Sequence, residues 1–168
     1  MYNETIRKQV MAIYPEAYIK YLLYFHADRD YFECHEVLED HWKRVPKPER
    51  ESHWVTLIQI AVALYHERRG NLKGAEILYR RLEKRIDKDQ EALHALGLDQ
   101  RQLHKDIMER KRFLGKQPFV DYNLPLNDQA LIDECRERSA KEVKEWQKAS
   151  QLEDHALVHK HRERWKEG

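Results

Sequence analysis

A histidine and a glutamate stand one helical turn apart in the run Tyr31-Phe-Glu-Cys-His-Glu-Val-Leu-Glu-Asp-His-Trp42. On a helix, His35 and Glu39 would share one face, beside the apolar stripe that joins Tyr31 to Trp42. Ionisable groups rarely enter an apolar interface without a partner. The run therefore marks a candidate polar site, where the two side chains could share a hydrogen bond or a ligand.

These residue types could hold a metal ion. Histidine nitrogen and glutamate oxygen bind Zn²⁺, Mn²⁺ or Fe, and the string His-Glu-x-x-Glu resembles the zinc-protease motif His-Glu-x-x-His. The motif is incomplete, because position 39 is a carboxylate and Glu36 lies about 100° around the helix from His35. His66 is the candidate third ligand, so the metal site would consist of His35, Glu39 and His66. Gln59, seven residues before His66, is a poor ligand for transition metals.

A structural role is the alternative for the same residues. Buried polar side chains generally satisfy one another, and a hydrogen bond from His35 or His66 to Glu39 would fix the register of two packed helices. Gln59 could bridge these groups. Trp42 fits the core of such a bundle, with its indole N–H donated to a nearby acceptor. This interpretation is favoured, so we expect no stoichiometric metal and no cofactor.

The elements that position these groups follow from the helical spacing of apolar residues. The expected helices span about 15–28, 30–45, 49–69, 72–87, 90–114, interrupted or bent near Gly97, and 128–151. The third is apolar around most of its circumference and should be the most buried. Between the third and fourth, Gly70 can take the left-handed conformation and Asn71 can cap the next helix. Residues 118–125 should form an extended connector.

Composition supports an all-α fold. The chain has 168 residues, is 41% hydrophobic and contains only 5 Gly and 5 Pro. We expect a compact bundle of helical hairpins with an additional charged C-terminal helical region. Residues 1–116 would form the bundle core, and residues 117–168 a linker, an amphipathic helix and a charged tail packed on the same domain. The tail histidines His155, His159 and His161 should be solvated.

Charge and motifs exclude several functions. Lys and Arg number 31 against 30 Asp and Glu, so nucleic acid is not an expected partner. A basic stripe at helical spacing is expected to be a solvated face; it contains Arg80, Arg81, Lys84, Arg85 and Lys88. The sequence has no membrane-length apolar stretch and no signal-peptide pattern, so a cytoplasmic location is expected. The two cysteines should be reduced, and dinucleotide, P-loop and α/β-hydrolase motifs are absent.

Several spaced motifs together resemble the bacterial family known as domain of unknown function 309. The resemblance rests on the run from Tyr31 to Trp42, on Leu57-Ile-Gln-Ile-Ala61 through His66, and on Gly70-Asn71 with Gly74-Ala75, and it spans roughly residues 15 to 87. It implies an all-α bundle with the signature residues His35, Glu36, Glu39, Trp42, Gln59, His66 and Asn71. It implies no activity, because none is established for the family.

Two functions from different classes follow. The first is a non-enzymatic, soluble helical binding or scaffold protein with a buried His/Glu/Gln cluster, which would bind a protein partner or form a homodimer. The second is a small metal- or ligand-binding enzyme that uses His35, Glu39 and His66. The first is favoured, because the polar set is small and lacks a recognisable nucleophile.

Overall fold

The computed structural model describes residues 3–44, 46 and 53–160. In this part of the chain, a π-helical turn η1 (Tyr24–Asp28) separates α2 from α3, and the helices are α1 (Glu4–Ile13), α2 (Glu16–Leu23), α3 (Tyr31–Lys43), α4 (His53–Arg68), α5 (Leu72–Lys88), α6 (Gln90–Ala95), α7 (Gln100–Phe113), α8 (Gln129–Lys141) and α9 (His155–Val158). No strand occurs among the described residues, where Leu98 and Leu126 form an isolated bridge. The predicted all-α bundle is confirmed.

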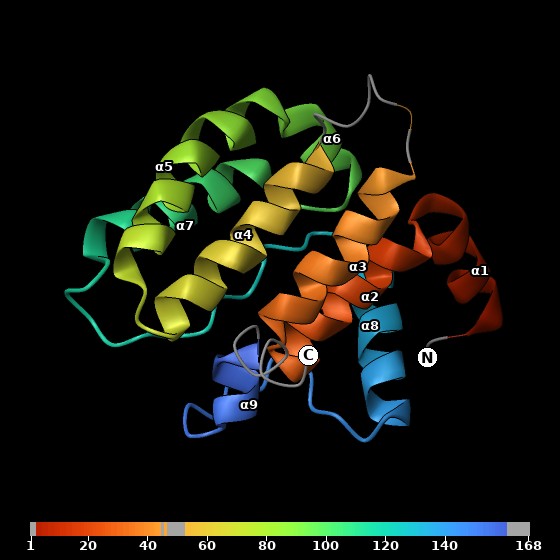
Figure 1. Cartoon of the computed structure of the whole chain (residues 1–168). Helices are drawn as coiled ribbons and strands as arrows, with labels where there is room; N and C mark the ends of the chain where they lie inside the picture. The colour runs from red at the N-terminus through yellow and green to blue at the C-terminus, as the bar shows by residue number, and fades with distance from the viewer. Residues whose placement is uncertain (1–2, 45, 47–52, 161–168) are drawn as a thin grey trace.

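Helix α4 lies at the centre of the bundle, between α3 and α5 (Figure 1). Helix α7 packs against α5, α2 packs on α3, and α8 packs against α1 and α2. Residues all around α4 are buried, among them Trp54, Leu57, Ile60, Ala61 and Leu64. This burial confirms the prediction that the third expected helix is the central element, because only a helix covered on several sides can bury apolar residues all round.

Local sequence signals set the ends of the helices that carry the candidate site. The Asp30 side chain accepts a hydrogen bond from the Glu33 N–H and caps α3. Gly70 has a φ of 86° and ends the turn after α4, and the Asn71 side chain accepts from the Gly74 N–H at the start of α5. The α4–α5 junction is therefore formed as the sequence predicts.

Other boundaries differ from the expected ones. Helix α1 was not predicted, and the expected start of the third helix near residue 49 lies outside the described residues. Helix α8 ends at Lys141 rather than near residue 151, because Val143 takes a positive φ of 57° and the Lys144 N–H bonds back to the Ser139 carbonyl. Trp146, which the helical spacing assigned to this helix, instead packs against the His26 ring, with the centroids 4.5 Å apart.

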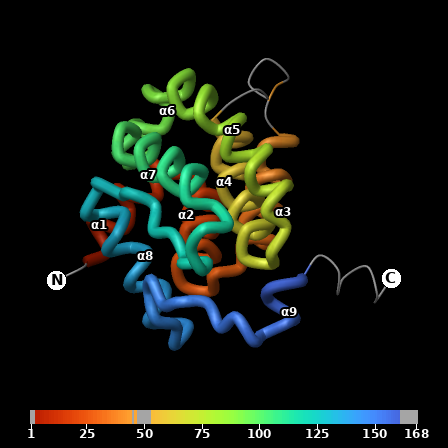
Figure 2. The backbone as a smooth tube through the Cα atoms, turned by 90° about the vertical axis from the view of Figure 1, so that its left-hand side faces the viewer, coloured from red at the N-terminus to blue at the C-terminus, as the bar shows by residue number. Residues whose placement is uncertain are grey.

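The C-terminal segment, residues 144–160, runs across one end of the bundle (Figure 2). Buried Arg29 holds it by donating from Nε to the Lys148 carbonyl at 2.7 Å, and from Nη1 to the Tyr122 carbonyl of the connector at 2.7 Å. Arg68, at the end of α4, donates to the Arg29 carbonyl at 2.6 Å and to Ser150 Oγ at 3.0 Å. Two arginines thus join the bundle, the connector and the C-terminal segment.

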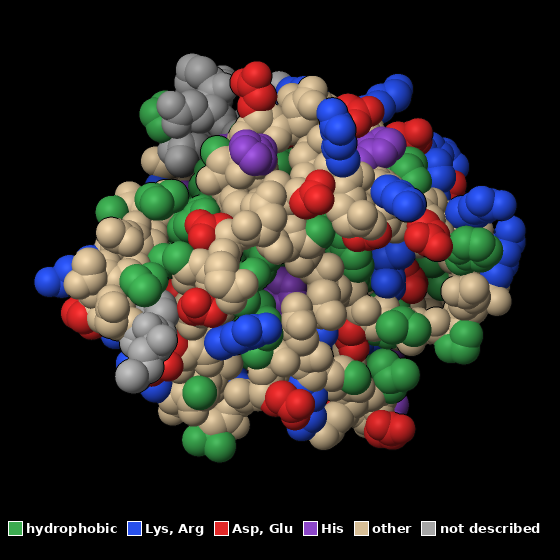
Figure 3. All heavy atoms as spheres, turned by 180° about the vertical axis from the view of Figure 1, so that it is seen from behind, with side chains coloured by type: hydrophobic (Ala, Val, Ile, Leu, Met, Phe, Trp, Pro, Cys, Tyr) green, Lys and Arg blue, Asp and Glu red, His purple; other side chains and the backbone are tan. Residues whose placement is uncertain are grey.

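Charged side chains of both signs are mixed on the face seen in Figure 3. On the face seen in Figure 3, basic side chains gather toward one edge, with acidic side chains among them. In the basic stripe of α5, Arg80 pairs with Glu76, and Lys111 of α7 pairs with Glu83. No helix in the described ranges is long and apolar enough to cross a membrane. Of the tail histidines, His155 is exposed and His159 is half-buried, whereas His161 lies outside the described residues.

Candidate functional site

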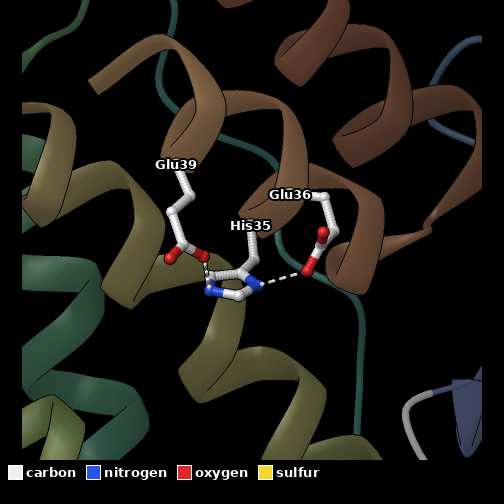
Figure 4. A group of neighbouring side chains, drawn as sticks. All are labelled: His35, Glu36 and Glu39. Atoms are coloured by element: carbon white, nitrogen blue, oxygen red, sulfur yellow. Dashed lines mark ion pairs between the residues drawn. The ribbon is translucent and has the colours of Figure 1, made fainter. Parts of the chain in front are cut away.

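Helix α3 brings one histidine between two glutamates (Figure 4). His35 Nε2 lies 2.7 Å from Glu39 Oε2, and its Nδ1 lies 3.3 Å from Glu36 Oε1. Lys43 Nζ contacts the other Glu39 oxygen at 3.1 Å. The expected His35–Glu39 pair is present. Glu36 lies about 100° around the helix from His35, and its long side chain still reaches the second ring nitrogen.

This group is half-buried, and the predicted burial of the cluster is wrong. The His35 and Glu39 side chains each keep 30% of their accessible surface. The core-facing positions of α3 are Tyr31, Cys34 and Leu38, which are completely buried. His35 and Glu39 lie beside that stripe, so the α3–α4 contact covers only one side of each. An edge position of this kind permits contact with ligand or solvent.

The other two predicted members on α3 and α4 lie along the same interface. Trp42 packs at the margin of the hydrophobic core, as expected for a structural tryptophan. Gln59 was expected to bridge the histidines, but its Oε1 is buried and accepts no hydrogen bond from any described residue. His35 pairs with Glu36 and Glu39 instead, because both carboxylates are within reach on its own helix.

The α4–α5 junction fixes the orientation of His66. Because Asn71 Oδ1 accepts the Gly74 N–H, the amide nitrogen of Asn71 is the atom that faces His66 Nδ1, at 3.1 Å. An amide nitrogen can only donate, so Nδ1 accepts and the proton of the neutral imidazole lies on Nε2. Gly74 makes room for this arrangement, since a Cβ there would lie 2.6 Å from Asn71 Nδ2.

We therefore expect Gly74→Ala to disturb His66. Alanine in a helix usually stabilises by about 0.5–1 kcal/mol relative to glycine. Here the added Cβ would displace the Asn71 amide, so that gain should be absent and the His66 ring should lose its fixed tautomer. The ¹⁵N chemical shifts of the His66 ring measure the tautomer directly. Lys73→Ala, at an exposed neighbouring position, is the control, and unchanged ring shifts in Gly74→Ala would contradict the prediction.

A pocket of about 240 Å³ opens where the start of α3 faces the end of α4. It is lined by Tyr31, Phe32, His35, Val62, Tyr65, His66 and Arg69. The structure thus places His35 and His66, which the sequence singled out, at one pocket. Arg69 was missed, although it shares one helical face with Val62, Tyr65 and His66 at spacings of three and four residues.

The residues that could hold a metal differ from the expected set. Among the described residues, His35, Glu36 and Glu39 offer ligand atoms within 4.8 Å of one another. Glu36 takes the place that the sequence interpretation gave to His66. Both carboxylates already contact the His35 ring, and Glu39 also pairs with Lys43. A metal ion would have to displace these contacts.

Comparison with known proteins identifies relatives without a known activity. The model of a domain of unknown function (DUF309) matches residues 18–78, a span that contains all seven signature residues named from the sequence. The uncharacterized protein YpuF of Bacillus subtilis (strain 168) is 40% identical over 155 residues, which cover 89% of this chain and 87% of YpuF. No solved structure matches the chain.

Proposed function

This chain belongs to the domain of unknown function 309 family, and we propose that it is a non-enzymatic helical binding protein whose binding site is the α3–α4 pocket. The family assignment brings no activity with it. The proposal is carried by the pocket itself, which joins apolar walls to a few polar groups. Ligand sites in proteins usually have this form.

The size and walls of the pocket favour a small occupant. Phe32, Val62 and Tyr65 supply apolar surface, and the polar groups come from His35, His66 and Arg69. Pockets for drug-sized ligands measure about 300–1,000 Å³, whereas this one measures about 240 Å³. A compact metabolite or one side chain of a protein partner or second copy would fill it.

Binding is favoured over catalysis by how the two histidines are used. Both ring nitrogens of His35 face carboxylates of its own helix, and Nδ1 of His66 accepts from Asn71. No serine, cysteine or lysine lines the pocket, so it offers none of the common nucleophiles for covalent catalysis. The alternative, a small enzyme using His35, Glu39 and His66, is supported by the position of both histidines at one pocket.

A pocket-filling substitution tests the proposal. Ligand-observed NMR with a library of small organic molecules should give compounds that bind the wild-type protein and fail to bind Val62→Trp, whose indole would occupy the pocket. Ile77→Trp adds the same group on α5, at an exposed position outside the pocket, and should bind the same compounds as wild type. Equal binding to wild type and Val62→Trp would place the ligands elsewhere and reject the proposal.

A further inference from the structure

Arg69 is a half-buried cation that lies at the edge of this pocket and has no counter-charge among the described residues. Its Nε is buried and has no hydrogen-bond partner among the described residues. Its guanidinium carbon lies 5.4 Å from the centre of the Tyr65 ring, and it forms no salt bridge within the described part of the chain. Arg68 also has an unpaired Nε, but its Nη1 donates to the Arg29 carbonyl, and Arg110 pairs with Glu67. A guanidinium without an acceptor gains hydrogen bonds by binding one, so an acceptor on a ligand would be favoured here.

The rest of the pocket has matching electrostatics. No aspartate or glutamate lines it. His66 also lines the pocket, and the Asn71 amide places its imidazole proton on Nε2. The planar guanidinium of arginine matches a carboxylate with two parallel hydrogen bonds. The pocket therefore combines donors for an anion with aromatic and aliphatic surface.

We infer that the pocket binds a small organic monocarboxylate with a flat or branched apolar body, and that Arg69 binds its carboxylate group. This inference rests on the proposed binding function and adds the class of ligand. The apolar body would lie against Phe32, Val62 and Tyr65. An inorganic anion would leave these walls uncovered, and a multiply charged ligand would bring more negative charge than the single arginine neutralises.

A larger hollow near the C-terminal segment does not offer the same chemistry. It has a volume of about 460 Å³ and is lined by charged residues of η1, α3 and the C-terminal segment. Its charges largely neutralise one another, as Lys144 pairs with Asp28, and Lys160 with Asp30 and Glu33. The α3–α4 pocket differs from this hollow because the guanidinium of Arg69 has no counter-charge among the described residues.

Matched carboxylates and amides test the inference on the full chain. Phenylacetate, 4-methylpentanoate and indole-3-acetate are titrated alongside their amides by protein-observed NMR, with the wild type, Arg69→Met and Val62→Trp. We expect at least one carboxylate to bind the wild type at least about tenfold more tightly than its amide. Arg69→Met should remove this preference, because it retains the length of the side chain and deletes only the guanidinium.

The outcomes separate the inference from the proposed function. If amides and carboxylates bind equally, or if Arg69→Met keeps the preference, the carboxylate inference is wrong, while loss of binding in Val62→Trp still supports a binding pocket. If none of the six compounds binds at millimolar concentration, the carboxylate inference is rejected, and the wider compound library decides the proposed function on its own.

Discussion

As the pH falls from about 6.5 to 5, the free energy of unfolding is expected to fall by up to about 1.4 kcal/mol per pH unit because of His26 alone. His26 is completely buried, and burial lowers its pKa to about 3. Its Nδ1 donates to the Leu22 carbonyl, and its Nε2 accepts the Leu124 N–H at 3.0 Å. A proton on Nε2 would meet that N–H directly. The unfolded chain therefore takes up the proton first, and stability is lost as the pH decreases below the ordinary histidine pKa.

Urea unfolding between pH 7 and 5 measures this slope. His26→Gln retains a donor and an acceptor without a titrating ring, so its stability should change less over the same range. Burial also lowers the pKa values of His41 and His53, which act in the same direction and remain in the variant. The difference between the wild type and His26→Gln in the slope of unfolding free energy against pH therefore measures the contribution of His26. Exposed His155→Gln is the control, and a His26→Gln slope equal to that of the wild type would contradict the assignment.

Features of the fold that depend on local sequence could be predicted. Gly70 and Asn71 form the expected junction, and the apolar residues all around α4 identified the central helix. Both could be predicted because helix caps and buried helix faces depend on residues that are close together in the sequence. Helical spacing also placed His35 and Glu39 on one face. It could not give their burial, because half-burial at the edge of a stripe depends on how closely α3 approaches α4.

Contacts between distant parts of the chain could not be predicted. The partners of Arg29 and Arg68 are mostly backbone carbonyls, some as far away in sequence as Lys148. Because every residue has a backbone carbonyl, the residue types do not identify such an acceptor. His26 reads as one more residue of the first expected helix, although its ring joins η1 to the connector at Leu124. The pocket was missed for the same reason, since Arg69 reads as a surface charge until α3 and α4 are packed together.

The adjacent arginines at the end of α4 should respond differently to the same substitution. Arg68 lies over the Tyr31 ring at 4.6 Å and donates to the Arg29 carbonyl and Ser150 Oγ, and burial lowers the pKa of its guanidinium. Arg68→Met would remove the side-chain donor to the buried Arg29 carbonyl and one of the two hydrogen bonds of Ser150 Oγ, and we expect a loss of about 2–3 kcal/mol in the free energy of unfolding.

Arg69→Met is the matched control, because the Arg69 side chain donates to no described residue, and it should cost less than about 1 kcal/mol. Urea denaturation compares the two variants, and limited proteolysis reports where the chain has loosened. Cleavage between residues 144 and 154 should accelerate in Arg68→Met alone, since Arg68 holds this segment through Ser150.

Equal losses of stability would mean that the C-terminal segment is held mainly by Arg29 and by Asp121, which accepts hydrogen bonds from the Ser150 N–H and hydroxyl. A larger loss of stability in Arg68→Met than in Arg69→Met would show that Arg68 stabilises the fold, whereas Arg69 contributes little to stability and is available to bind a ligand.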